Sequence, residues 1–403
     1  MGGSLIVKFA PALGLGAMSL GTSAWAQDQA PERRLDFGAS AVSTYESNLL
    51  KLPDAPIFGL RQEREDVRVT PALTLDLQVP LGRQSVFLSG LAGYDFYANH
   101  DELNRERIQL DGGGNLRLST CQTRLGLRFA REQSDLADIL SGERLANAET
   151  RWVYDGRLSC GNGNGITPSI GYEHERVENS DPDRQTGNYS ADTVTGGLGF
   201  ARPVLGEFAI NASYRKGRYD DRRLDANIPE RLETFTAGGS FTRKIGSQLT
   251  GMVSAGWTKV DPNLPGVRGF SGASWAADLT WTPGTRLQAT FGAARQAQQS
   301  NLLGISYAIV DDYRVNATYA LGDRLQLSSG ANYARRSLRD SPLTPGALLR
   351  EEDKTYRLRA GASYRPSYRL TLSLDASGER RTSSNRLFNY DNFMVALTTR
   401  LHV

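Results

Sequence analysis

The chain has 403 residues and a formal net charge of +3, so its charge balance gives no indication of a nucleic-acid partner. Its mean hydropathy is −0.42, and beyond residue 26 no apolar stretch approaches the roughly 20 residues that a transmembrane helix needs. The 42 glycines, 16 tyrosines and 23 % charged residues instead suit membrane-spanning strands, in which only alternate residues face lipid.

The N-terminus predicts a secretory signal peptide. Lys8 supplies the positive charge, residues 9–20 form an apolar run too short to span a bilayer, and small residues form a cleavage site that ends at Ala26. A retained membrane anchor is the alternative. We expect residues 1–26 to be removed and residues 27–403 to form one exported domain.

Short turn signals then recur about every 40 residues. Each interval between them holds two strands and one longer polar segment. The turn signals are centred near residues 82, 121, 162, 205, 246, 284, 322 and 366. The longer polar segments include residues 134–148, 178–190, 220–230, 261–271 and 338–352. Short turns at one end and long loops at the other are typical of an outer-membrane barrel.

The predicted fold class is therefore all-β, a transmembrane antiparallel up-and-down β-barrel of about 18 strands. Eight tight turns pair sixteen strands, and strands near residues 35–45 and 390–403 open and close the barrel. An even number of strands places both termini at the short-turn, periplasmic end. A repeat of about 40 residues could also indicate a β-propeller, but a propeller repeat has four short strands rather than two long ones.

Apolar and polar residues alternate within these strands. In residues 67–79, 107–118 and 356–364 one face is apolar and the other carries arginines and other polar groups. A one-residue slip would move arginines into lipid, at about 2–4 kcal/mol each near mid-bilayer, so the register is well specified. Aromatic residues near the strand ends suit the membrane interface, or else the core of a soluble β-sandwich.

Few residues suggest chemistry, and we expect no enzyme, no catalytic residue, no metal and no cofactor. The chain has three histidines, and only His174 lies between acids, Glu173 and Glu175. Strand neighbours point to opposite faces, so this triplet predicts a solvated strand rim rather than a metal site or a catalytic base. The glycines at 112–114 lack the helix and lysine of a phosphate-binding loop.

Two cysteines, Cys121 and Cys160, lie in consecutive short turns. Neighbouring hairpins of a barrel lie side by side, so the two thiols could reach disulfide distance. We predict a disulfide at the periplasmic end, with two free thiols as the alternative.

The polar strand faces are where function should reside, since they line the lumen. The predicted lumen-lining basic residues are Arg68, Arg117, Arg124, Arg128, Arg157, Arg215, Arg314, Arg357, Arg359 and Arg400. The acids predicted on the same faces are Asp76, Asp111, Asp155, Asp278 and Asp375. An excess of fixed arginine would favour anions. The alternative is that these charges pair across the lumen and hold it open, and both readings stay open.

Three short segments carry a family resemblance, namely residues 42–49, 64–67 and 80–84, together with the two turn cysteines. The chain resembles a family of outer-membrane β-barrel porins that are encoded beside exopolysaccharide synthesis genes in proteobacteria. The resemblance implies a channel through which a secreted polysaccharide leaves the cell. It also implies contacts with outer-membrane lipid, with an envelope-spanning export complex and with the outer-membrane assembly machinery. Many such barrels end in an aromatic residue, whereas this chain ends in Val403.

We therefore expect passive export of an exopolysaccharide, which a basic lumen would favour if the polymer is anionic. A general or anion-selective diffusion porin for small solutes is the alternative. A structural or enzymatic barrel is the third hypothesis, which loss of activity on substituting His174 would revive.

Overall fold

A computed structural model describes residues 33–53, 63–136, 146–161, 164–202, 204–223, 228–300, 304–340 and 350–402. The predicted signal peptide and Val403 lie outside these residues, so cleavage after Ala26 stays a prediction.

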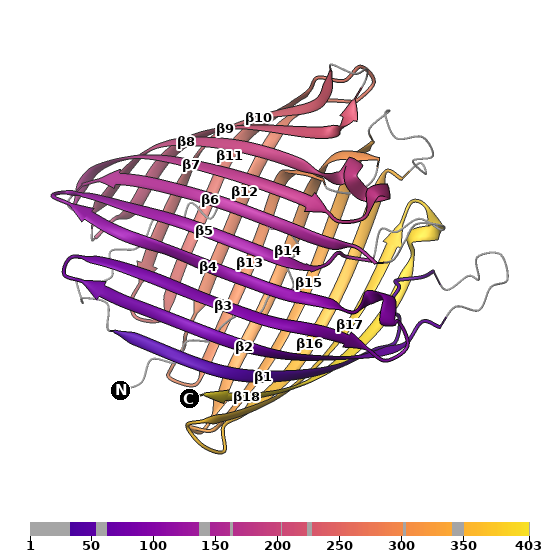
Figure 1. Cartoon of the computed structure of the whole chain (residues 1–403). Coiled ribbons are helices and arrows are strands. Elements are labelled where there is room, and N and C mark those ends of the chain that lie inside the picture. Colours follow the sequence, from indigo (N-terminus) through magenta and orange to yellow (C-terminus); the bar gives the residue numbers. More distant parts are fainter. Residues whose placement is uncertain are drawn as a thin grey trace.

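The described residues form one antiparallel sheet of eighteen strands that closes into a barrel (Figure 1). Strands consecutive in the chain are neighbours in the sheet, and the last strand, β18, pairs with the first, β1. Closure removes the unpaired edges of the described sheet, and the predicted barrel is confirmed. The strands are β1 (Arg34–Glu46), β2 (Asp66–Leu81), β3 (Gln84–Tyr97), β4 (Arg105–Leu118), β5 (Cys121–Gln133), β6 (Ala148–Cys160), β7 (Gly165–Asn179), β8 (Tyr189–Arg202), β9 (Gly206–Arg223), β10 (Pro229–Ile245), β11 (Leu249–Pro262), β12 (Phe270–Trp281), β13 (Leu287–Gln299), β14 (Ile305–Leu321), β15 (Leu325–Asp340), β16 (Glu352–Tyr364), β17 (Leu370–Ser383) and β18 (Tyr390–His402).

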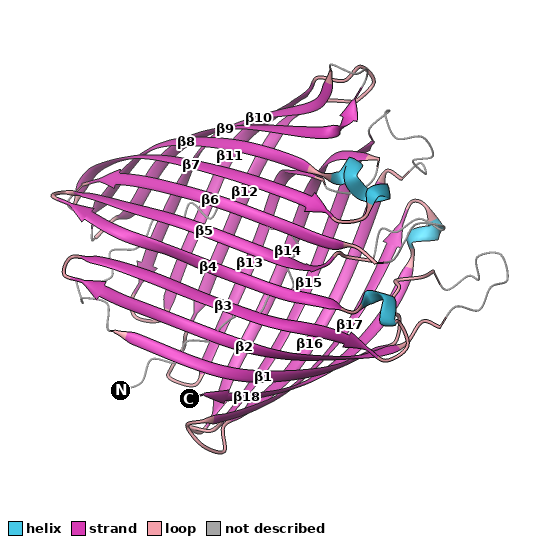
Figure 2. Ribbon diagram, in the orientation of Figure 1, coloured by secondary structure: helices cyan, strands magenta, loops and turns pink. Residues whose placement is uncertain are grey.

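The two ends of the barrel differ in the length of their connections. Short connections lie at the end where β1 begins and β18 finishes. In the two-residue connection between β2 and β3, Gly82 has a φ of +66°, which glycine adopts without steric cost. The longer connections lie at the opposite end and include the 3-10 helices η1 (Asp101–Leu103), η2 (Pro182–Gly187) and η3 (Arg386–Phe388) (Figure 2). By this asymmetry the short-turn end is periplasmic.

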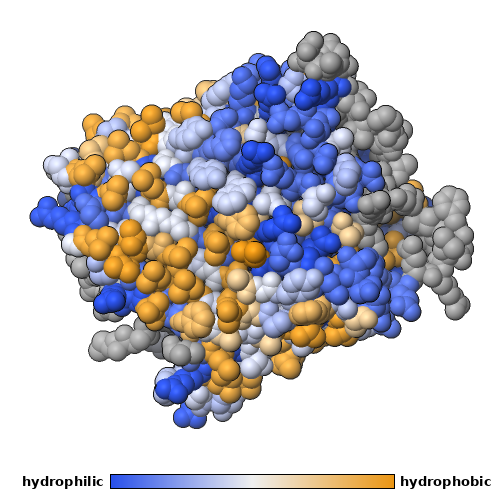
Figure 3. All heavy atoms as spheres, in the orientation of Figure 1, coloured by the Kyte–Doolittle hydropathy of each residue, from blue (hydrophilic) through white to orange (hydrophobic). Residues whose placement is uncertain are grey.

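Apolar side chains cover the outside of the strands. On β18, Phe393, Leu397 and Leu401 are each about half exposed on the outer face, as the alternation predicts. Figure 3 shows apolar residues spread over the strands and hydrophilic residues gathered toward the end with the longer connections. Among the described residues, no helix is long and apolar enough to cross a membrane. The strands therefore present their apolar face to lipid and their polar face to the lumen.

Small apolar clusters lie at the end with the longer connections. In one of them, Leu103 of η1 packs with Leu49, Leu50, Tyr97 and Leu136, which come from two other connections and the end of β3. Burial of these side chains stabilises the bases of the connections against the barrel rim.

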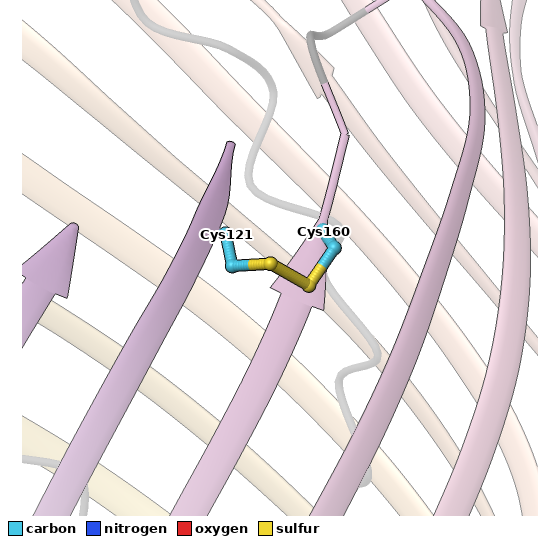
Figure 4. The surroundings of a disulfide bond; sticks show 2 residues. All are labelled: Cys121 and Cys160. Carbon is cyan, nitrogen blue, oxygen red and sulfur yellow. A yellow bond between two sulfur atoms is a disulfide. The ribbon is translucent and has the colours of Figure 1, made fainter. Parts of the chain in front are cut away.

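A disulfide joins the periplasmic ends of two adjacent strands. Cys121 begins β5, Cys160 ends β6, and the two residues face each other in the ladder. Figure 4 shows their sulfur atoms joined, with an S–S distance of 2.08 Å. The sequence separation of 39 residues makes this a closed loop around the whole β5–β6 hairpin.

We expect a maleimide polymer to leave both cysteines of the urea-unfolded protein unmodified unless a reductant is added first. These are the only 2 cysteines of the chain, so a shift in gel mobility reports on this pair alone. Reduction should cost at most about 4 kcal/mol of stability by loop entropy, and less where ladder hydrogen bonds already hold the hairpin. Modification of both thiols without reductant would contradict the disulfide.

Candidate functional site

The inward faces of the strands enclose a cavity of about 570 Å³ inside the barrel. Charged residues line two parts of its wall, and a stretch of small uncharged residues lies between these parts in the order of the strands. The larger charged part, which we call the charged wall, consists of Arg128, Arg151, Glu173, Glu175 and Arg215, on strands β5, β6, β7 and β9. The smaller part consists of Asp278, Arg295 and Arg314, on β12, β13 and β14. The cavity is therefore polar, with two chemically different walls.

The uncharged wall is formed by small side chains of β8–β12, strands that also carry the charged Arg215 and Asp278. Its hydroxyl, amide and glycine residues are Thr195, Asn211, Ser213, Thr234, Thr236, Gly238, Ser240, Ser254, Gly256, Thr258 and Ser274. The hydroxyl groups of Thr236 and Thr258 lie 2.9 Å apart on adjacent strands. Such a surface offers many weak hydrogen-bonding groups, none of which carries a charge.

The hairpin of β13 and β14 separates from β12 and leans into the lumen, while β14 stays paired with β15. The ladder between β12 and β13 ends at Trp275 and Arg295, although β13 continues to Gln299. All residues from 294 to 299 line the cavity, so both faces of this strand segment are inside the barrel. Residues 305–312 of β14 are buried without alternation, which agrees with a segment enclosed on both sides.

Polar contacts hold the tip of this hairpin against β9 and β10. The Tyr219 hydroxyl donates to the carbonyl oxygen of Ser306 at 2.8 Å and to that of Ser300. Arg222 Nη1 donates to the carbonyl oxygen of Ile305 at 2.8 Å, and the Ser306 hydroxyl donates to Glu230. Tyr219, Arg222 and Glu230 are almost fully buried, so the hairpin covers them.

Apolar packing completes the contact. Leu232 of β10 and Val260 of β11 point inward, because they lie two residues from the cavity-lining Thr234 and Thr258 on the same strands. They form a buried cluster with Tyr307 and Ile309 of the hairpin. Leu264 and Val267 complete this cluster. The hairpin therefore narrows the lumen from the extracellular side. Sequence analysis did not predict it, but the unbroken apolar run at residues 307–310 was a usable signal, because a wall strand should alternate.

Half of the predicted lumen arginines form ion pairs between described residues. Arg128 lies 3.2 Å from Glu173, Arg215 lies 2.6 Å from Glu175, and Arg151 lies 2.9 Å from Glu175. Arg215 also lies 3.8 Å from Glu173, so these contacts join three arginines and two glutamates into one network along the charged wall. Glu173 and Glu175 therefore do not form the solvated rim predicted from the sequence, since Glu175 is buried in this network.

The other predicted arginines divide into two groups. Arg68 lies 4.0 Å from Asp95, Arg314 pairs with Asp278 at 2.5 Å, and Arg357 Nε donates to Glu379 at 2.6 Å. Arg124, Arg157 and Arg359 have no acidic group within 4.0 Å among the described residues. The backbone N–H of Arg117 donates to the Gln84 side chain at 2.6 Å, and Arg400 is half buried at the periplasmic end of β18.

The sequence analysis missed several inward acids, namely Asp95, Glu132, Glu149, Glu173, Glu175 and Glu379. Counting positions in phase along each strand could have found them. The lumen is consequently closer to charge balance than the sequence suggested, and pairing dominates over an overall excess of arginine.

His174 points away from this network. Its Nδ1 lies 2.9 Å from an Asp192 carboxylate oxygen, which also accepts from the Tyr172 hydroxyl at 2.6 Å. Tyr172 and Asp192 are exposed on the outer face of β7 and β8. Within the described ranges, no cluster of His, Cys, Asp and Glu is placed to hold a metal ion.

A protein family described as "Putative beta-barrel porin 2" matches residues 53–403 of the chain. A search of curated proteins found no match. Among solved structures, Pseudomonas aeruginosa OccK2 (OpdF) is similar at 10% identity and a TM-score of 0.49, covering 92% of this chain and 98% of that one. OpdK of Pseudomonas aeruginosa is similar at 12% identity and a TM-score of 0.47, covering 92% and 99%. Acinetobacter baumannii OccAB3 is similar at 11% identity and a TM-score of 0.46, covering 92% and 99%.

Proposed function

The chain belongs to the beta-barrel porin 2 family, and from that premise we propose that this outer-membrane porin conducts a secreted exopolysaccharide out of the cell. The observation that carries this proposal is the uncharged wall of hydroxyls and glycines on β8–β12. Sugar rings carry hydroxyls all round, and this wall can exchange hydrogen bonds with them at many equivalent positions.

Conduction needs contacts strong enough to admit a solute and weak enough to release it. A wall with neutral groups such as Thr236, Ser254 and Thr258 meets this condition, because no single group holds a sugar tightly. The paired charges of the charged wall keep the lumen hydrated without a large net field. An 18-stranded barrel is wide enough for an aqueous channel.

The channel has no energy source in this proposal. Polymer synthesis and an envelope-spanning complex on the short-turn end supply the driving force, and the outer-membrane assembly machinery inserts the barrel. Porins of this kind are channels, and we propose no catalytic step.

The inward hairpin favours a second candidate, a diffusion porin for small polar solutes. The hairpin contacts β9, β10 and β11 across the lumen, which leaves less room for a polymer than an open barrel would. For small solutes this constriction would act as a size filter.

Deletion of this chain from the source bacterium should abolish extracellular polysaccharide while synthesis continues, so that polymer accumulates in the periplasm. Fractionation followed by a total-carbohydrate assay measures both pools, and plasmid-borne wild-type protein should restore secretion. Unchanged secretion with normal synthesis would contradict export. In that case, faster uptake of small sugars into proteoliposomes would favour the diffusion porin.

A further inference from the structure

We propose that Arg124 and Arg157 form an anion subsite near the periplasmic mouth, which binds the carboxylate groups of an acidic saccharide. This inference rests on the proposed function, since it assigns the charge of the saccharide that the channel conducts. It concerns a part of the lumen that the charged network of Arg128, Arg151 and Arg215 does not reach by ion pairing.

The two arginines face each other directly. Arg124 of β5 and Arg157 of β6 are ladder partners, and partners on one face have Cβ atoms about 4.5–5.5 Å apart. Both lie on the inward face, in phase with Arg128 and Asp155. Like charges in this position repel, so the pair opposes stability unless an anion lies between the guanidinium groups.

Nearby acids are already engaged or at a distance. Asp155 is 3.6 Å from Arg128, and Asp111, the ladder partner of Arg128, interacts electrostatically with Arg124 without forming an ion pair with it. Within the described part of the chain, no carboxylate lies within 4.0 Å of either Arg124 or Arg157. The lumen arginines nearer the extracellular end, by contrast, have acidic partners. An unsatisfied arginine pair is thus a feature of the periplasmic half of this wall.

The surroundings leave room for a ligand and help to hold the pair. The Arg124 guanidinium lies 5.3 Å from the centre of the Phe87 ring, which positions it by a cation–π contact. Beside Arg157 in the ladder is Gly171, where an added Cβ would meet nothing nearer than 3.6 Å. A side chain is therefore missing where a sugar ring would lie, and Asn115, the ladder partner of Arg124, offers an amide on the other flank.

The disulfide gains a role in this arrangement. Cys121 and Cys160 join the same two strands three ladder positions from Arg124 and Arg157. A covalent link at this point keeps the strand ends from splaying under the repulsion of the two guanidinium groups. Two forked guanidinium groups held side by side suit carboxylates, which accept paired hydrogen bonds from arginine.

The test uses the full-length protein in planar bilayers, with trigalacturonate and maltotriose as the acidic and neutral probes. Trigalacturonate added on the periplasmic side should block the wild-type current more strongly than maltotriose. Arg124→Gln/Arg157→Gln should weaken the block by trigalacturonate about tenfold and leave the block by maltotriose unchanged. Arg124→Lys/Arg157→Lys keeps the charge but not the fork, and should restore the block only in part.

The matched control is Arg68→Gln/Arg357→Gln, which removes the same charge from ion-paired lumen positions on other strands. It should change the block by trigalacturonate far less than Arg124→Gln/Arg157→Gln does. Heat-dependent gel mobility verifies that each variant is folded. An equal loss in the control, or an unchanged block in Arg124→Gln/Arg157→Gln, overturns the subsite. If trigalacturonate and maltotriose block the current equally, the anion subsite is overturned but the proposed glycan conduction is not. If neither probe blocks the current, both proposals are overturned.

Discussion

Replacing residues 296–310 with an Asn-Gly turn should raise the single-channel conductance about twofold or more, because an 18-stranded barrel without the inward hairpin leaves an open aqueous channel. Arg295 and Asp311 face each other in the ladder, so the new turn would close the hairpin at the level where β13 still pairs with β12. The wall strands keep their register, and planar-bilayer recording gives the conductance directly. An unchanged conductance would show that the hairpin does not limit the pore.

A cross-link between the β13–β14 hairpin and β9 can test whether the constriction of the lumen is fixed or moves. A Cβ added at Gly217 would meet the side-chain amide of Gln299, so cysteines at these two positions can be joined by a short, reducible thiol reagent. The background must carry Cys121→Ser and Cys160→Ser, so that reduction acts on the new link alone. If the hairpin moves aside for a polymer, linking should stop glycan passage and reduction should restore it. The same protein before and after reduction is its own control.

Leu397→Arg should destabilise the barrel by about 2–4 kcal/mol, the cost of an arginine on the lipid face near mid-bilayer. Leu397 is 50% exposed on the outer face near the middle of β18, the strand that closes the barrel against β1. The substitution should weaken the pairing that closes the barrel as well as the contact of this position with lipid, so the folded fraction should fall sharply. Urea titration in lipid vesicles measures the free energy of unfolding.

The neighbouring residue supplies the control for this prediction. Thr398 points into the lumen, one position along the same strand. Thr398→Arg should therefore leave stability within about 1 kcal/mol of the wild type, since its charge would meet water. Similar losses in Leu397→Arg and Thr398→Arg would contradict the assignment of the two faces.

The barrel was predictable because its determinants are local. Each strand must alternate to separate lipid from water, and each two-residue turn needs a residue such as Gly82 that accepts a positive φ. These requirements repeat along the chain and do not depend on which strands meet. The pairing of β1 with β18 then followed from closure alone.

The lumen was less predictable because its contacts join distant strands. Strand alternation correctly gives the face on which Arg128 and Arg215 lie, yet their partners, Glu173 and Glu175, come from a third strand, β7. Which acid reaches which arginine depends on the stagger between strands and on side-chain length. The pattern of residues within each single strand does not reveal how far neighbouring strands are shifted along one another.

The sequence by itself determined an exported β-barrel with an apolar outside, a polar inside and two cysteines at adjacent periplasmic turns, because the membrane acts on every strand in the same way. The tertiary structure alone decided that the β13–β14 hairpin enters the lumen and that Arg124 faces Arg157, with no carboxylate of the described residues within 4.0 Å of either. The physical reason is that both features depend on contacts across the barrel or between strands. Packing and charge pairing compete in those contacts, and the alternation of apolar and polar residues within one strand does not determine the outcome.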